Sequence, residues 1–224
     1  MEKRHLFIKT DKNFIVSLPR FTFDGKIVVV QSERETRQAI DYLADCEIVG
    51  FDTETRPSFQ KGVVHKVALL QISTEDICFL FRLCMTGLMP EVIGFLSDRN
   101  IIKVGLSLSD DFMMLRKRAA FTPEGFIDLQ SYVKAMGIED LSLQKLYANV
   151  FHQRISKRAQ LKNWEADVLD EAQRLYAATD AYACLKLYKE LRELRSTGAY
   201  VLVKQQSITT DTPNPSQSDI NIQL

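Results

Sequence analysis

The chain has 224 residues, of which 46% are hydrophobic and 26% charged, a composition typical of a globular protein with one large domain. Its 29 basic and 29 acidic residues cancel, which argues against coating of nucleic acid through bulk positive charge but allows a local basic patch. No apolar run reaches the roughly 18 residues of a membrane span, and the N-terminus lacks the apolar segment of a secretory signal. The four cysteines form no CxxC pair. We therefore expect reduced thiols, a cytoplasmic protein and no membrane partner.

The first half of the chain is rich in β-forming runs. The expected elements are a strand at 25–31, a helix at 32–46 and three further strands at 47–54, 64–73 and 76–81. Ser32 and Glu35 would open the helix with a capping box. The short connections between the last three strands favour an antiparallel meander.

Strands and helices alternate in the second half. The expected elements are a helix near 90–98, a strand at 101–105, a helix from about Ser109, a strand at 125–130, helices at 131–137 and 141–150, and a last helix from about Asp170 to Leu194. Gln173 completes a capping box at the start of the last helix, and Gly198 lies where a helix end is expected. A meander followed by this alternation indicates a mixed α/β sheet with helices on both faces.

We divide the chain into an N-terminal extension (1–25), a central domain (26–198) and a C-terminal extension (199–224). The end of the chain, "SITTDTPNPSQSDINIQL", is rich in Ser, Thr, Asn, Gln and Pro. Because such a segment has little apolar surface to bury, we expect disorder from about residue 207.

The stretch "EIVGFDTET" (47–55) reads as a buried strand that ends in two acids. Residues two apart on a strand share a face, so Asp52 and Glu54 point the same way and repel unless a cation or a proton lies between them. Carboxylate oxygens suit a hard divalent ion such as Mg²⁺ or Mn²⁺. For this motif alone, the simpler alternative is a pair of acids that face solvent.

Two further acids strengthen the metal interpretation. Asp111 lies near the start of the helix after 101–105, where the helix dipole favours an anion, with Asp110 as the competing candidate. Asp180 lies in the last helix, one turn after Tyr176. Two divalent ions ~3.5–4 Å apart need about four carboxylates. Tyrosine, with its usual pKa of about 10, is a poor general base at neutral pH, so we expect Tyr176 to orient the attacking water.

The motifs "FDTETRPSF", "KVGLSLSDDFMML" and "YAATDAYACLKLY", in this order, resemble those of the DEDDy-type 3′–5′ exonucleases, the superfamily of RNase D and the Werner syndrome exonuclease domain. The resemblance spans about residues 26–195, and the register from "KVG" selects Asp111 over Asp110. It implies that residues 26–198 form an exonuclease domain with an RNase H-like fold. The expected fold is a mixed five-stranded sheet flanked by helices, with its first three strands antiparallel.

The same resemblance implies the chemistry. Two divalent ions, Mg²⁺ or Mn²⁺, would be held by Asp52, Glu54, Asp111 and Asp180, with Asp52 bridging both. With Tyr176, these acids would hydrolyse phosphodiester bonds of DNA or RNA from a single-stranded 3′ end and release nucleoside 5′-monophosphates.

A basic segment, "FHQRISKRAQLKNWE" (151–165), precedes the last helix. Its four cations are candidates for contacts to backbone phosphates: Arg154, Lys157, Arg158 and Lys162. An ordinary solvated surface is the alternative. Arg56 and Phe59 follow the first motif closely enough to touch the terminal nucleotide. Protein partners are left open by the sequence.

Two other functions remain open. A non-catalytic member of the same fold would serve as a nucleic-acid-binding or assembly module, although such proteins normally lose an acid or the tyrosine, and here all five positions are filled. Another RNase H-like enzyme, such as an endonuclease or an integrase, would cut a circular single strand, but the Y-x-x-x-D helix argues against it. No motif distinguishes DNA from RNA.

Overall fold

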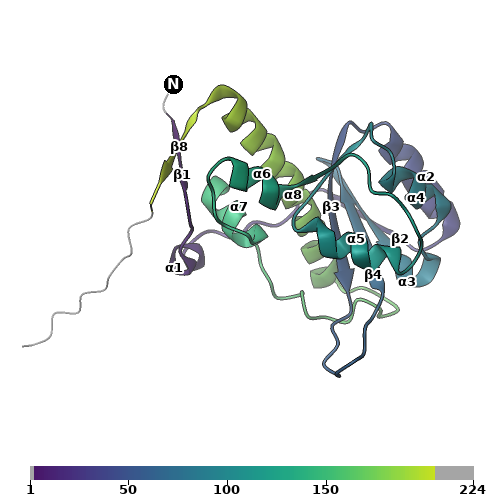
Figure 1. Ribbon diagram of the computed structural model, residues 1–224. Helices are drawn as coiled ribbons and strands as arrows, with labels where there is room; N and C mark the ends of the chain where they lie inside the picture. Colours follow the sequence, from purple (N-terminus) through teal and green to yellow (C-terminus); the bar gives the residue numbers. More distant parts are fainter. Residues whose placement is uncertain (1–2, 205–224) are drawn as a thin grey trace, which may run out of the picture.

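The computed structural model describes residues 3–204, which form a mixed α/β fold around a six-stranded sheet (Figure 1). In spatial order its strands are β2 (Lys26–Val30), β5 (Ile77–Arg82), β4 (Val67–Ser73), β3 (Ile48–Thr55), β6 (Ile102–Gly105) and β7 (Phe126–Asp128). The pairs β3–β4 and β4–β5 are antiparallel, and the other pairs are parallel. The expected meander and the mixed sheet are confirmed.

The number of strands differs from the expected five. The additional strand is β2, which extends the sheet beyond β5 in parallel, with Val28 opposite Phe79. Its run of branched residues fits a half-buried strand, and Val30 is fully buried in the core. The sequence pattern had indicated a strand at 25–31, so the difference lies in where this strand pairs.

Helices cover both faces of the sheet, as expected (Figure 1). One face carries α2 (Glu33–Ala44), α4 (Pro90–Leu96) and α5 (Leu108–Arg116), and the short α3 (Leu83–Thr86) follows β5. The other face carries α8 (Glu171–Thr197), with α6 (Leu129–Ala135) and α7 (Leu143–Phe151) packed beside it. Phe51 of β3 packs in the core on the side of α2, α4 and α5, and Leu69 of β4 packs in the core on the side of α8. The sheet thus separates two apolar layers.

The long helix α8 begins and ends where its sequence signals predict. Asp170 accepts a hydrogen bond from the backbone of Gln173, whose side chain bonds back to Asp170. Gly198 ends the helix in the left-handed conformation, with φ of 63°. The capping box of Ser32 and Glu35 at the start of α2 is also confirmed.

A second, two-stranded sheet joins segments from the two ends of the chain. It pairs β1 (Arg4–Phe7) with β8 (Tyr200–Val203) in parallel, and α1 (Lys12–Val16) follows β1. Asn149 of α7 bonds both backbone groups of Phe7 at 2.8 Å, and Leu6 is buried in the core that α7 and α8 share. The disorder expected from residue 207 lies outside the described residues. Between residues 3 and 204, no helix is long and apolar enough to cross a membrane.

Candidate active site

Three of the four predicted acids converge tightly. Each of Asp52, Glu54 and Asp180 offers a carboxylate oxygen, and these oxygens lie within 4.8 Å of one another. Glu54 and Asp180 are buried, and Asp52 is partly buried. Asp52 and Glu54 project from β3, and Asp180 projects from α8, which packs on that face of the sheet.

A glycine explains why the helix approaches the strand so closely. At Gly50 of β3, an added Cβ would lie 1.9 Å from the carbonyl oxygen of Ala181. Because glycine carries no side chain, the backbone of α8 can lie directly on β3. Asp180 precedes the contact residue in the chain, so this contact sets its distance from the acids of the strand.

Asp111 reaches the cluster from the opposite layer. It lies in the first turn of α5, and its carboxylate accepts a hydrogen bond from the hydroxyl of Thr53, between the two acids of β3. Its charge raises the pKa of Asp52. Asp110 beside it is exposed. The structure thus directs Asp111, as the motif register predicted, toward the site, although it stands outside the group of three.

Asp128, at the end of β7, holds the turn that presents Asp111. Its carboxylate accepts hydrogen bonds from the backbone N–H groups of Ser107 and Leu108, at 3.1 and 3.0 Å. Ser107 has a left-handed backbone, with φ of 64°, which costs a residue with a side chain about 1–2 kcal/mol. Asp128 was not predicted from the sequence, where its only signal is an acid between a strand and a helix.

The carboxylates raise one another's pKa. Burial, and then the charges of Asp180 and Asp111, hold the pKa of Asp52 well above its usual range. Burial and the neighbouring acids raise the pKa of Glu54 to about 10. Burial raises the pKa of Asp180 to about 7 and that of Asp111 to about 6. At neutral pH these groups therefore require a cation or protons between them.

The donor set fits a divalent cation. Oδ1 of Asp180 is buried and has no hydrogen-bond partner among residues 3–204. Three carboxylate oxygens within 4.8 Å are hard ligands of the kind that Mg²⁺ and Mn²⁺ prefer. An uncompensated carboxylate in such a place is costly, and a bound cation would remove that cost.

Tyr176 lies one turn before Asp180 on the buried side of α8. A hydrogen bond from Tyr176 lowers the pKa of Asp180 and so opposes part of the effect of burial. Burial, followed by the charge of Asp180, raises the pKa of Tyr176 above its ordinary value. The phenol therefore keeps its proton and can act as a hydrogen-bond donor.

The four cations of the basic segment differ in their surroundings. Burial raises the pKa of Asp180, and the positive charge of Lys157 opposes part of that effect. Arg158 and Lys162 line a cavity beside Tyr176. Nε of Arg154 donates to the carbonyl oxygen of Leu18 at 2.9 Å and so tethers the N-terminal segment.

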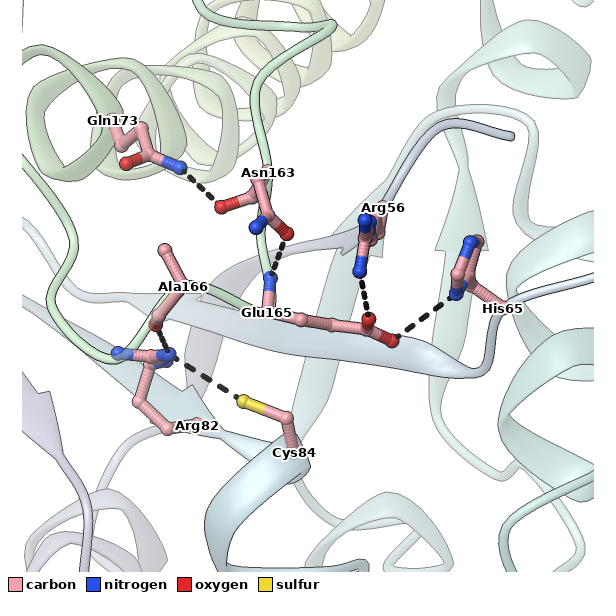
Figure 2. A network of polar contacts seen from close by, with 8 residues as sticks. All are labelled: Arg56, His65, Arg82, Cys84, Asn163, Glu165, Ala166 and Gln173. Atoms are coloured by element: carbon pink, nitrogen blue, oxygen red, sulfur yellow. Dashed lines mark hydrogen bonds and ion pairs between the residues drawn. The ribbon is translucent and has the colours of Figure 1, made fainter. Parts of the chain in front are cut away.

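The two candidates after the first motif also differ. The guanidinium of Arg56 pairs with Glu165 at 3.3 Å, so this side chain links its loop to the basic segment (Figure 2). Phe59 is 88% exposed in the same loop, which leaves its ring available. Trp164, in the segment that Arg56 contacts, is fully buried and belongs to the core.

A polar network fixes the end of the basic segment against the sheet (Figure 2). Glu165 pairs with His65 at 3.5 Å as well as with Arg56. Arg82, fully buried at the end of β5, donates to the carbonyl oxygens of Ala166 and Asp167. The sequence analysis missed Arg82, because its partners are backbone groups 84 and 85 residues away.

Comparison with known proteins gives a consistent picture. Residues 27–195 match the model of a 3′–5′ exonuclease family. The chain is 30% identical over 191 residues to the mouse bifunctional 3′–5′ exonuclease/ATP-dependent helicase WRN, an alignment that covers 81% of this chain and 14% of that protein. It is 30% identical over 194 residues to a 3′–5′ exonuclease of Arabidopsis thaliana, covering 80% of this chain and 67% of the relative.

A solved structure supports the fold. The Nibbler EXO domain of Aedes aegypti superposes with a TM-score of 0.73 at 19% identity, covering 80% of this chain and 94% of that chain. Since the family match includes all three motifs and most of the chain, and the motif acids meet around one point, this protein belongs to the 3′–5′ exonuclease family.

Proposed function

We propose that this protein removes nucleotides one at a time from the 3′ end of a single strand of DNA or RNA and releases nucleoside 5′-monophosphates. The observation that carries the proposal is the convergence of Asp52, Glu54 and Asp180 within 4.8 Å. These acids lie within the matched exonuclease family region, and Tyr176 lies one helical turn before Asp180.

The residues fit a site for two ions, Mg²⁺ or Mn²⁺. Glu54 and Asp180 would hold the first ion, Asp111 would serve the second, and Asp52, which feels the charges of both Asp180 and Asp111, would bridge them. When bound, such ions activate a water and stabilise charge on the attacking and leaving oxygens. Tyr176, fixed as a hydrogen-bond donor beside Asp180, would orient that water.

The strand would be held by the side chains around the acids. Lys157, whose charge acts on Asp180, is one candidate for a phosphate contact, and Arg158 and Lys162, in the cavity beside Tyr176, are two others. The exposed ring of Phe59 could stack on a base.

Arg56 and Arg154 also make structural contacts within the chain. Each already binds a partner within the chain, Glu165 and the carbonyl oxygen of Leu18 respectively. We therefore assign both to holding the segments that contact the strand, with any nucleic-acid contact made by their remaining N–H groups. We also propose a cytoplasmic location, in keeping with four cysteines that are all free thiols.

The test uses single-stranded DNA and RNA of one sequence, labelled at either end, with Mg²⁺ or Mn²⁺. Wild type should shorten the 5′-labelled strand stepwise from its 3′ end, and EDTA or Asp52→Ala should abolish the reaction. Asp110→Ala, which removes an exposed neighbouring acid, is the matched control and should retain activity. The relative rates on the two strands rank DNA against RNA.

Two outcomes would contradict the proposal. Binding of both strands without cleavage in either metal would favour the non-catalytic nucleic-acid-binding module. Cleavage of a circular single strand would favour an endonuclease, since a circle offers no 3′ end.

A further inference from the structure

A cavity of about 310 Å³ lies beside Tyr176. Its walls come from three segments: the first turns of α8, residues 155–162 and residues 20–22. Three lining side chains are cationic: Arg20, Arg158 and Lys162. Since no acidic side chain of the described chain lines it, the cavity attracts an anion.

Two of these cations are available to a ligand. The guanidinium groups of Arg20 and Arg158 make no hydrogen bond or ion pair with any residue between 3 and 204. The ammonium of Lys162 pairs at 2.6 Å with Asp170, whose side chain is 53% exposed. Even with this pair counted as neutral, the cavity keeps two positive charges.

Arg20 stands on a fixed backbone. Arg20 forms a parallel β-bridge with Arg154. In this bridge Phe21 N donates to the carbonyl oxygen of Arg154, and Arg154 N donates to that of Pro19, both at 2.9 Å. Three residues after Arg20, Phe23 N donates to the hydroxyl of Thr179 in α8 at 3.1 Å. The position of Arg20 is therefore set relative to the helix that carries Tyr176, and an anion would be bound without first ordering the chain.

We propose that this cavity binds a backbone phosphate of the substrate strand other than the one being cleaved, with Arg20 and Arg158 as its main ligands. The inference rests on the proposed function, because it takes a strand whose 3′ end lies at the acids. Guanidinium groups match phosphate oxygens in charge and geometry, and two from different segments can grip one phosphate. Tyr176 bounds the cavity and precedes Asp180 by about one turn of α8, so the two sites adjoin.

Arg20 lies outside residues 27–195, which match the exonuclease family. The proposal thus assigns the N-terminal segment of this chain to substrate binding. The sequence alone had indicated only the basic segment as a binding surface, and this assignment adds the N-terminal segment to it.

The first test measures binding without catalysis. A fluorescent single-stranded oligonucleotide, as DNA and as RNA, is titrated in EDTA at several salt concentrations with wild type and with Arg20→Ala/Arg158→Ala. The control is Arg34→Ala/Arg99→Ala, which removes the same charge from exposed sites on α2 and after α4. The cavity variant should raise Kd about tenfold and reduce the slope of log K against log salt by about 0.7, the value for one phosphate of a single strand. Changes equal to those of the control would overturn the proposal.

The second test separates the cavity from the cleaved phosphate. The 4-nitrophenyl ester of thymidine 5′-monophosphate carries only the phosphate to be cleaved. With Mn²⁺, the cavity variant should lose at least about tenfold more kcat/KM on the oligonucleotide than on the ester. Equal losses on both would place the arginines at the reacting phosphate and refute the inference. If wild type hydrolyses neither substrate while the binding difference persists, the proposed function fails and the phosphate site stands.

Discussion

Replacing Asp180 with Asn should stabilise the metal-free protein. Burial raises the pKa of Asp180 from 3.8 to about 7, so folding penalises its ionised form. As pH rises from about 4 to 7, the carboxyl ionises first in the unfolded chain, and the wild type loses stability over that window. A difference of roughly 3 pKa units corresponds to about 4 kcal/mol at neutral pH, falling to about 1–2 kcal/mol near pH 5. Asn carries no charge and avoids this penalty.

The assay is urea unfolding in EDTA at about pH 5 and about pH 7. Asp180→Asn should exceed wild type at both values, and by more at the higher one. Asp110→Asn, an exposed acid nearby, should change the free energy of unfolding by less than about 0.5 kcal/mol. Adding Mg²⁺ or Mn²⁺ should stabilise wild type, by about 2.7 kcal/mol at a concentration of 100 Kd, and the variant far less. Equal stability of the two proteins in EDTA at both pH values would refute the reasoning.

Three further substitutions test other parts of the structure. Gly50→Ala should lower the free energy of unfolding by more than about 2 kcal/mol, because the new Cβ collides with the carbonyl of Ala181; an unchanged urea midpoint would contradict that close approach. Arg82→Met should cost at least about 2 kcal/mol, since it removes a buried guanidinium and its hydrogen bonds to two partly buried carbonyl groups, and an equally stable variant would show that they find other partners. Tyr176→Phe should lower kcat about 10²-fold with little change in KM; a change confined to KM would make Tyr176 a substrate-binding residue instead.

Much of the acid cluster could be predicted because its spacing is local. Asp52 and Glu54 share a face through the two-residue period of a strand, and Tyr176 and Asp180 share one through the turn of a helix. The structure confirms that Asp52, Glu54 and Asp180 converge. Their separation could not be predicted, because it depends on how closely α8 approaches the sheet.

The buried cations could not be predicted, because their partners are distant in sequence or belong to the backbone. Lys103 is the one charged residue of the strand β6. It is nevertheless fully buried, and its ammonium donates to the carbonyl oxygens of Phe95 and Asp98. Burial lowers the pKa of Lys103 to about 8. Arg20 is an exposed cation, and nothing in the sequence around it marks it as functional. Its place in the cavity beside Tyr176 depends on contacts with residues far along the chain, such as its bridge to Arg154.

The parallel pairing of β1 with β8 bears on the order in which the molecule can assemble. Arg4 lies opposite Tyr200, so β1 can pair with β8 only after all the residues between them have been synthesised. Contacts of such long sequence separation form late, because the closing loop loses much conformational entropy. The segment that carries Arg20 follows β1 and α1, and its own partners, Arg154 and Thr179, also lie far along the chain. During synthesis the central sheet can therefore form before the N-terminal segment docks, and the basic cavity is completed last.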